Sequence, residues 1–190
     1  MDVREQCVAS AIRREIVLPE TKPETEWLRG RAVRKMSPRW DHARLQAWWL
    51  RELSAWAADR GYVLPEWRFR ITPPGEATRP LIPDVAYLAY DRLGDADEST
   101  VQTPLVPPNV VVEIRSPGDR RADVEDKAAT FVRAGAELVI LVNPRTRTVI
   151  AIDATERRIF SGGDSFVHAT LPGFTFALSV MFDELRLRRG

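Results

Sequence analysis

Two short, strongly apolar segments constrain the fold of this chain more than any other feature. Residues 110–114 read Val-Val-Val-Glu-Ile, and residues 138–142 read Leu-Val-Ile-Leu-Val. A strand that is apolar on both faces lies inside a sheet whose two faces are both covered. We therefore predict one sheet that contains these two segments and a third strand over residues 81–90, with helices over residues 38–60 and 119–134 as the covering layers.

The helix predicted over residues 38–60 has apolar residues at helical spacing, including Leu45 and Trp49. Ser37 is a typical N-cap, and Gly61 is typical of the position after a helix end. Its three tryptophans could stack on nucleobases, but aromatic residues at this spacing more often belong to a core. We interpret all three, which are Trp48, Trp49 and Trp56, as core residues.

The order of helices and strands indicates the α/β (α+β) class, with a mixed central sheet flanked by helices. The 190 residues, 44% of them hydrophobic, suffice for one domain with a core. We predict an N-terminal arm over residues 1–18, which includes a short helix over residues 2–18, and a single domain over residues 19–190. Residues 91–109 are predicted to form a loop, and the apolar segment after Leu171 is predicted to cover an edge of the sheet.

Charge and cysteine content exclude several classes of function. The 28 Lys and Arg residues balance the 27 Asp and Glu residues, so nucleic-acid binding would need a local basic patch. The single cysteine, Cys7, excludes an intramolecular disulfide and a cysteine-rich zinc site. No apolar segment approaches the roughly 20 residues that span a bilayer, and the N-terminus lacks a secretory signal. We expect a soluble, cytoplasmic protein with no membrane partner.

Two acidic residues lie where the pattern predicts buried strands. Asp84 follows Pro83 at the start of one strand, and Glu113 interrupts the apolar run of another. An ionised side chain in such a position is unfavourable unless something neutralises it. Neighbouring strands lie about 4.8 Å apart, so both carboxylates can converge on one hard cation such as Mg²⁺. Lys127 borders the buried face of its helix and can reach over the sheet towards them.

Structural ion pairs would explain the same residues without any chemistry. Glu113 could pair with Arg115 or Lys127, and long lysine side chains often extend from an inner face to solvent. His42 is either an exposed polar residue near a helix start or a group close to a site. Its position alone favours the exposed residue.

Motifs along the chain resemble those of one family. They are Pro83 to Ala86, Val111 to Pro117, Asp126-Lys127, Phe131 to Gly135, Leu141 to Pro144, Glu26 to Gly30, Met36 to Pro38 with His42, and Leu171 to Phe174. This pattern, over about residues 19–183, resembles the Uma-two family of putative restriction endonucleases. The resemblance implies the PD-(D/E)XK nuclease fold, which is a mixed sheet flanked by helices, and a metal-dependent phosphodiesterase site.

Residue by residue, the resemblance implies that Asp84 and Glu113 bind the metal, with the backbone of Ile114 as a further ligand, and that Mg²⁺ or Mn²⁺ is the cofactor. The superfamily has a lysine two residues after the second acid, where this chain has Arg115. Arginine does not lose its proton and is a poor base, although it can bind a substrate phosphate. Lys127 matches the helical lysine of the family and is expected to take the catalytic role.

The resemblance implies an endonuclease that hydrolyses DNA. We expect a homodimer, because cutting both strands of a duplex with one site per chain usually requires two chains. Glu26 matches another recurrent acid of the family, and it joins His42 as an additional site candidate. Two other functions remain compatible with these residues. One is a catalytically inactive nucleic-acid-binding or assembly module on the same fold, and the other is a structural protein whose acids are only ion-paired.

Overall fold

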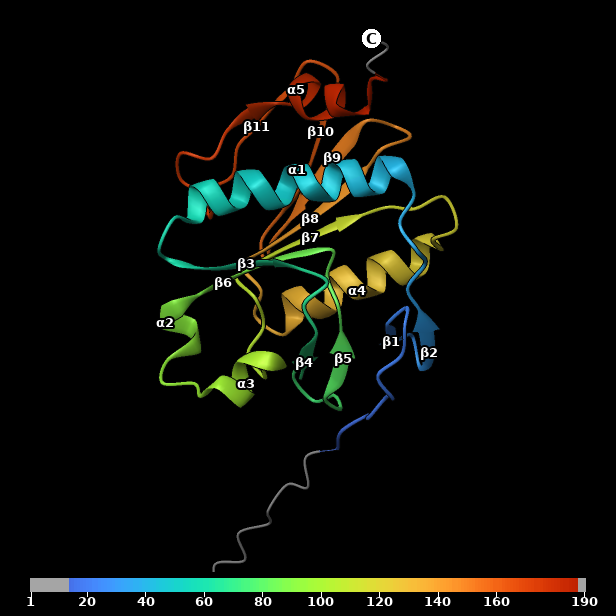
Figure 1. Cartoon of the computed structure of the whole chain (residues 1–190), viewed down its shortest axis with the longest axis vertical. Coiled ribbons are helices and arrows are strands. Elements are labelled where there is room, and N and C mark those ends of the chain that lie inside the picture. The colour runs from blue at the N-terminus through green and yellow to red at the C-terminus, as the bar shows by residue number, and fades with distance from the viewer. Residues whose placement is uncertain (1–13, 188–190) are drawn as a thin grey trace, which may run out of the picture.

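The structure, a computed structural model, describes residues 14–187 (Figure 1). Of the helix predicted over residues 2–18, residues 2–13 lie outside the described residues. Residues 14–18 are extended, and the backbone N–H of Ile16 donates to the carbonyl of Thr78 at 2.8 Å. The predicted helix is therefore wrong for its last turn. In the described part of the chain, none of the helices combines the length and apolar character needed to cross a lipid bilayer.

A six-stranded sheet of mixed direction forms the centre of the molecule. Its strands follow the order β10 (Arg157–Ser161), β9 (Thr148–Ile152), β8 (Leu138–Asn143), β7 (Val110–Ile114), β6 (Val85–Ala89) and β3 (Gly61–Pro65). β7 and β8 are parallel and are joined by the crossover helix α4 (Arg121–Arg133), whereas the other pairs are antiparallel. The predicted class, and the predicted sheet that contains β6, β7 and β8, are confirmed.

The two long helices cover opposite faces of this sheet. α1 (Trp40–Ala57) lies on one face and α4 on the other (Figure 1). Alternation along β7 sends Val110 and Val112 into the core under α1 and Val111 into the core under α4, so Glu113 lies on the α4 face. The three tryptophans of α1, which are Trp48, Trp49 and Trp56, pack in the first core as predicted.

Both ends of α1 differ from the prediction. The helix follows Arg39, which makes no side-chain cap, so Ser37 is not its N-cap. The left-handed conformation expected at Gly61 occurs earlier, at Ala58, whose φ is 48°. Gly61 instead opens β3, where a Cβ atom would lie 2.4 Å from the carbonyl oxygen of Leu88 in β6. The absence of a side chain lets the two strands approach, and the sequence pattern fails to predict β3 because this glycine indicates a helix end.

The strand predicted over residues 81–90 is interrupted. It divides into β5 (Arg79–Leu81), which pairs with β4 (Phe69–Ile71) in a separate two-stranded sheet, and β6 of the central sheet. Pro83, between the two strands, has no N–H to donate to a sheet ladder. The break leaves the backbone of Ile82 and the side chain of Asp84 available to polar groups from other elements.

Short elements complete the N-terminal half and the middle of the chain. β1 (Thr25–Leu28) and β2 (Arg31–Arg34) form a hairpin around Gly30, and β1 contacts both α4 and β5. The loop predicted over residues 91–109 contains α3 (Glu98–Gln102) and most of α2 (Tyr90–Leu93). Asp97 caps α3 by accepting from the backbone N–H of Thr100.

The C-terminal segment packs on the α1 face and does not cover a sheet edge. It contains the paired strands β11 (Ser165–Phe166) and β12 (Phe176–Ala177), the helix α5 (Leu178–Phe182) and a 3₁₀ turn at Asp183–Leu185. Leu171 and Met181 are fully buried in the core under α1. The apolar side chains of this segment therefore extend the core under α1. The prediction that this segment covers an edge of the sheet is wrong.

Candidate functional site

Three acids, two of them buried and the third partly buried, meet where β7 ends. Glu113 belongs to β7, Asp84 to the break before β6, and Glu26 to β1. The antiparallel register of β6 and β7 places Val85 opposite Val112, so Asp84 and Glu113 come next along the two strands. Asp84 and Glu26 are 3% and 4% exposed. Asp84 and Glu113 thus lie at the adjacent ends of neighbouring strands and line one cavity.

Asp84 is held as an anion by charge and by a backbone hydrogen bond. Its Oδ1 lies 2.8 Å from Lys35 Nζ, and its Oδ2 accepts from the backbone N–H of Ile114 at 2.6 Å. His42 Nε2 lies 3.5 Å from the same Oδ2. Burial raises the pKa of this carboxyl, but Lys35 and His42 outweigh burial and hold the pKa well below its usual range. Asp84 is therefore ionised at neutral pH.

Lys127 connects the other two acids. Its Nζ lies 2.7 Å from Glu26 Oε1 and 2.8 Å from Glu113 Oε1, and it donates to the carbonyl oxygen of Ile82 at 2.7 Å. Burial lowers the pKa of Lys127, but Glu113 and Glu26 together raise it above the ordinary value. This lysine is therefore a protonated ammonium among oxygens, and it reaches over the sheet as its helical position predicts.

Glu113 differs from Asp84 in its protonation. Burial raises the pKa of Glu113 to about 8, although Lys127 acts in the opposite direction. Its Oε1 lies close to Lys127 Nζ but outside hydrogen-bonding geometry, and among the described residues no other donor satisfies it. At neutral pH this carboxyl keeps a proton that a cation could replace.

Lys35 and Glu66 belong to the same cluster, and sequence reasoning does not single them out. Lys35 Nζ lies 2.8 Å from Glu66 Oε2 as well as from Asp84 Oδ1, and it donates to the carbonyl of Ile82 at 3.0 Å. Lys35 directly follows β2, whose residues alternate between half-buried and exposed, and Glu66 follows β3. Neither segment has the apolar context that makes a charged residue conspicuous, so no local pattern could have found them.

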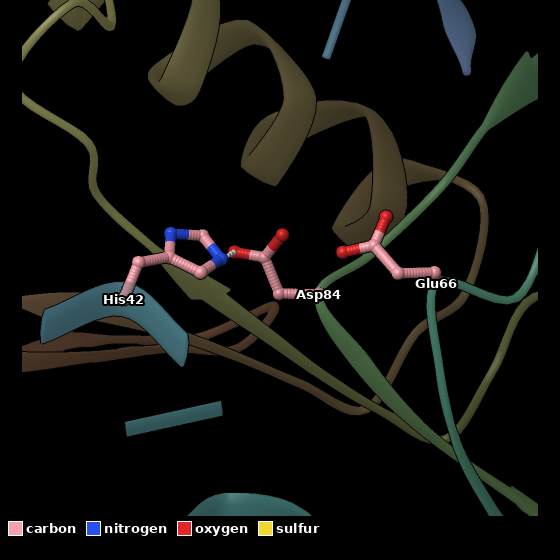
Figure 2. Close-up of side chains that lie close together, drawn as sticks. All are labelled: His42, Glu66 and Asp84. Carbon is pink, nitrogen blue, oxygen red and sulfur yellow. Dashed lines mark ion pairs between the residues drawn. The ribbon is translucent and has the colours of Figure 1, made fainter. Parts of the chain in front are cut away.

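His42 is buried, which corrects its interpretation as an exposed residue. It is 8% exposed, and its Nδ1 lies 3.2 Å from Ser116 Oγ. Figure 2 shows His42 and Glu66 directed at Asp84 from opposite sides, and the three residues bring possible ligand atoms within 4.8 Å of one another. Burial lowers the pKa of His42, but its hydrogen bond to Asp84 raises it above the ordinary value. His42 is buried because the first turn of α1 packs against the sheet. This packing joins segments that are distant in sequence, so the local sequence around His42 does not indicate it.

The cluster lines a cavity of about 260 Å³. All of Glu26, Lys35, His42, Asp84, Glu113, Ile114 and Lys127 contribute to its wall. Arg31, Arg34 and Arg120 also line it, and Arg31 pairs with Asp123. The cavity therefore combines a buried acidic floor with arginines, which is an arrangement suited to a cation and a phosphate together.

Arg115 lies apart from this cavity. Its backbone N–H donates to the carbonyl of Val142 at 2.8 Å, and its side chain borders two neighbouring cavities. The structure thus separates Arg115 from Lys127, which lies inside the acidic cluster.

The donor set fits a hard divalent cation. Asp84 and Glu113 offer carboxylate oxygens from adjacent strands, and Ile114 offers a backbone carbonyl, which are ligand types that Mg²⁺ accepts. The unsatisfied Oε1 of Glu113 is consistent with such a role. The ammonium groups of Lys35 and Lys127 supply positive charge at the same carboxylates.

A second group of possible ligands lies elsewhere and does not fit a metal. Asp153, Glu156 and His168 bring possible ligand atoms within 4.8 Å. However, His168 Nδ1 accepts from the backbone N–H of Thr170 at 3.2 Å, so a neutral ring carries its proton on Nε2, which faces Asp153 at 3.3 Å. A protonated ring nitrogen cannot bind a metal ion. The contact between His168 and Asp153 is therefore a structural hydrogen bond.

Comparisons with known proteins identify a family and a related fold. The model of the family Uma2, described as "Putative restriction endonuclease", matches residues 14–180. The chain is also similar in fold to a crystal structure described as a putative nuclease belonging to DUF820 from Anabaena variabilis. The two share 20% sequence identity with a TM-score of 0.78, over 89% of this chain and 95% of the other. No curated protein matches the chain.

Proposed function

We propose that this chain, which belongs to the Uma2 family, is a metal-dependent endonuclease that hydrolyses phosphodiester bonds of DNA. The observation that carries the proposal is the convergence of Asp84, Glu113 and Lys127 in one cavity at the end of β7. Arginines at the same cavity offer binding groups for the phosphates of a substrate.

In this proposal Asp84, Glu113 and the carbonyl of Ile114 hold one Mg²⁺ or Mn²⁺ ion. The bound ion supplies a Lewis acid that polarises the phosphate and makes the attacking water more acidic. Glu113 gives up its proton to the solvent when it becomes a ligand. Asp84 is already ionised and needs no such step.

Lys127 is proposed to act directly on the reacting groups. Its ammonium is fixed by Glu26 and by the carbonyl of Ile82, so its position does not depend on Glu113. A preorganised positive charge in a cavity with little water offsets negative charge that grows on the phosphate. The same ammonium can donate a hydrogen bond that orients the attacking water.

A second candidate function is nucleic-acid binding without cleavage. Two observations favour it: Arg115 replaces the lysine of the superfamily, and Lys35 and Lys127 already neutralise the acids without any metal. In that case the cluster would stabilise the fold, and the arginines alone would serve the function. The two candidates differ in whether the protein binds a divalent cation at Asp84.

The test is incubation of the purified protein with supercoiled plasmid DNA and Mg²⁺ or Mn²⁺. We expect nicked and linear products from the wild-type protein and none from Asp84→Ala or Glu113→Ala. Asp153→Ala is the matched control, because it removes a carboxylate that also pairs with a histidine but lies in the group that does not fit a metal. Cleavage that persists in Asp84→Ala, or that depends equally on Asp153, would contradict the proposal.

Replacing Lys127 and Arg115 separates catalysis from binding. We expect Lys127→Ala to lower the single-turnover rate at saturating DNA by about 10²–10³-fold, as loss of one transition-state donor does elsewhere. Arg115→Ala should weaken DNA binding and leave the maximal rate nearly unchanged, because a charge that binds substrate and transition state equally does not accelerate the reaction. Lys127→Arg, which keeps the charge, controls for lost stability. A full rate in Lys127→Ala combined with no rate in Arg115→Ala would reverse the two assignments.

A further inference from the structure

The parallel pairing of β7 and β8 brings two polar segments together beside the acidic cluster. The register places Ile114 next to Val142, and both strands end at the same edge of the sheet. Arg115 follows β7, and Asn143 is the last residue of β8. The backbone N–H groups of Arg145 and Thr146 donate to Asn143 Oδ1 at 3.0 and 3.3 Å. Asn143 therefore fixes the turn that carries Arg145.

A cavity of about 290 Å³ lies between this turn and the segment that leaves β7. Its wall consists of Asp41, Arg115, Ser116, Pro117, Asn143, Pro144, Arg145 and Thr146. Ser116 also lines the cavity of the acidic cluster. The two cavities thus adjoin each other across a single residue, and an extended ligand could enter both.

The charge of this second cavity is positive. Arg115 and Arg145 line this cavity together with one acid, Asp41, whose Oδ1 already accepts from the backbone N–H of His42 at 2.9 Å. Arg115 also borders the neighbouring cavity that Glu125 lines. Within residues 14–187 neither arginine has an ion-pair partner. The nearby arginines of the α4 face behave differently, because Arg121 and Arg157 both pair with Glu125. Unpaired guanidinium groups in a concave wall are typical of phosphate recognition.

We propose that this cavity binds a second phosphate of the nucleic-acid strand whose neighbouring phosphate enters the acidic cluster. The proposal rests on the proposed function for the identity of the substrate. None of the described residues that line the cavity is aromatic, so this wall offers no surface for stacking a base. Recognition here is of the backbone, and it is independent of base sequence. Arg115 and Arg145 hold the strand in register so that the adjacent phosphodiester faces Lys127.

The experiment measures binding without cleavage, by fluorescence anisotropy of a labelled duplex DNA in EDTA over a series of salt concentrations. We expect Arg115→Ala and Arg145→Ala each to weaken binding and to reduce the slope of log K against log salt by about 0.9, which corresponds to one lost phosphate contact. Asp41→Asn should have the opposite effect and strengthen binding. A variant that merely unfolds cannot produce this gain.

Arg60→Ala is the matched control, because Arg60 lies beyond the far end of α1 and stacks on Trp56. Unchanged affinity and slope in Arg145→Ala, while Arg34→Ala in the first cavity weakens binding, would overturn the proposal and leave the nuclease function intact. A second outcome is that Arg145→Ala loses DNA binding while the wild-type protein does not cut plasmid. It would support the second phosphate site and refute the proposed nuclease activity. The same titrations are repeated with single-stranded DNA and with RNA of the same sequence. The nucleic acid whose affinity falls most in Arg145→Ala is the one that supplies the phosphate.

Discussion

The part of the cluster around Asp84 and the part around Glu113 keep a carboxyl group buried in different ways. Asp84 shares the ammonium of Lys35 with Glu66, which is exposed, and it also accepts from a backbone N–H; its pKa lies well below the usual range. Glu113 shares the ammonium of Lys127 with Glu26, and burial raises its pKa to about 8. Two acids on adjacent strands therefore have opposite protonation at neutral pH.

The difference shows what stabilises a buried carboxylate. A backbone N–H and a cation shared only with an exposed carboxylate favour the ionised form, whereas a cation divided between two desolvated acids does not overcome the cost of burial. In the absence of a metal, one acid of the proposed site is ready to bind a cation, and the other must first lose a proton. Three experiments test this comparison.

The largest expected effect is on stability. Lys127→Met removes the cation that Glu26 and Glu113 share, and we expect the free energy of unfolding to fall by about 3–5 kcal/mol, which is typical of breaking a buried pair. Lys35→Met should cost less, because Asp84 keeps the N–H of Ile114. Urea unfolding at neutral pH measures both. Lys22→Met, at an exposed position, controls for the loss of any lysine. If Lys127→Met and Lys35→Met lower the free energy of unfolding equally, the parts of the cluster around Asp84 and Glu113 do not differ in the way described.

The next effect depends on pH. A carboxyl whose pKa is raised on folding takes up a proton when the chain folds, so it favours the folded state less as pH rises from about 4.5 to about 8. Glu113→Gln cannot titrate. We expect its unfolding free energy, relative to the wild type, to gain about 2 kcal/mol between pH 6 and pH 8, since one proton is worth about 1.4 kcal/mol per pH unit.

Urea unfolding at several pH values measures this difference. Asp84→Asn is the comparison variant, because Asp84 should stay ionised over the same interval and show no such slope. A constant difference between Glu113→Gln and the wild type from pH 6 to pH 8 would show that Glu113 is ionised throughout, and that the two acids are alike.

The smallest effect concerns metal affinity. The ammonium of Lys35 must leave Asp84 Oδ1 before that oxygen can bind a cation. We therefore expect Lys35→Met to bind Mn²⁺ about tenfold more tightly than the wild type, or by about 1.4 kcal/mol, in titration calorimetry. Lys22→Met again serves as the control. Weaker binding by Lys35→Met would mean that the lysine supports the metal site and does not compete with it.

The central fold could be predicted because its signals are local. The apolar runs of β7 and β8 and the helical spacing of α1 and α4 each point to burial independently of the rest of the chain. The edge strands give weaker signals. β3 begins at a glycine, and β10 has only Phe160 buried, so neither shows the apolar alternation that indicates a strand.

The candidate site follows the same division. Asp84 and Glu113 stand out because each is a charge within an apolar segment, and Lys127 because it borders a helical stripe. Lys35, Glu66 and the burial of His42 depend on how the hairpin and the first turn of α1 fold onto the sheet. These contacts join segments that are distant in sequence, and no local pattern encodes them.

Gly61 has a consequence for comparing this chain with its relatives. Because any Cβ at this position would collide with the backbone of β6, relatives that keep the same pairing of β3 and β6 should keep glycine there, whatever reaction they catalyse. An alignment would then show position 61 to be as invariant as position 84. Conservation alone would rank a steric requirement beside a proposed catalytic one, and the two can be told apart only by asking what each atom touches.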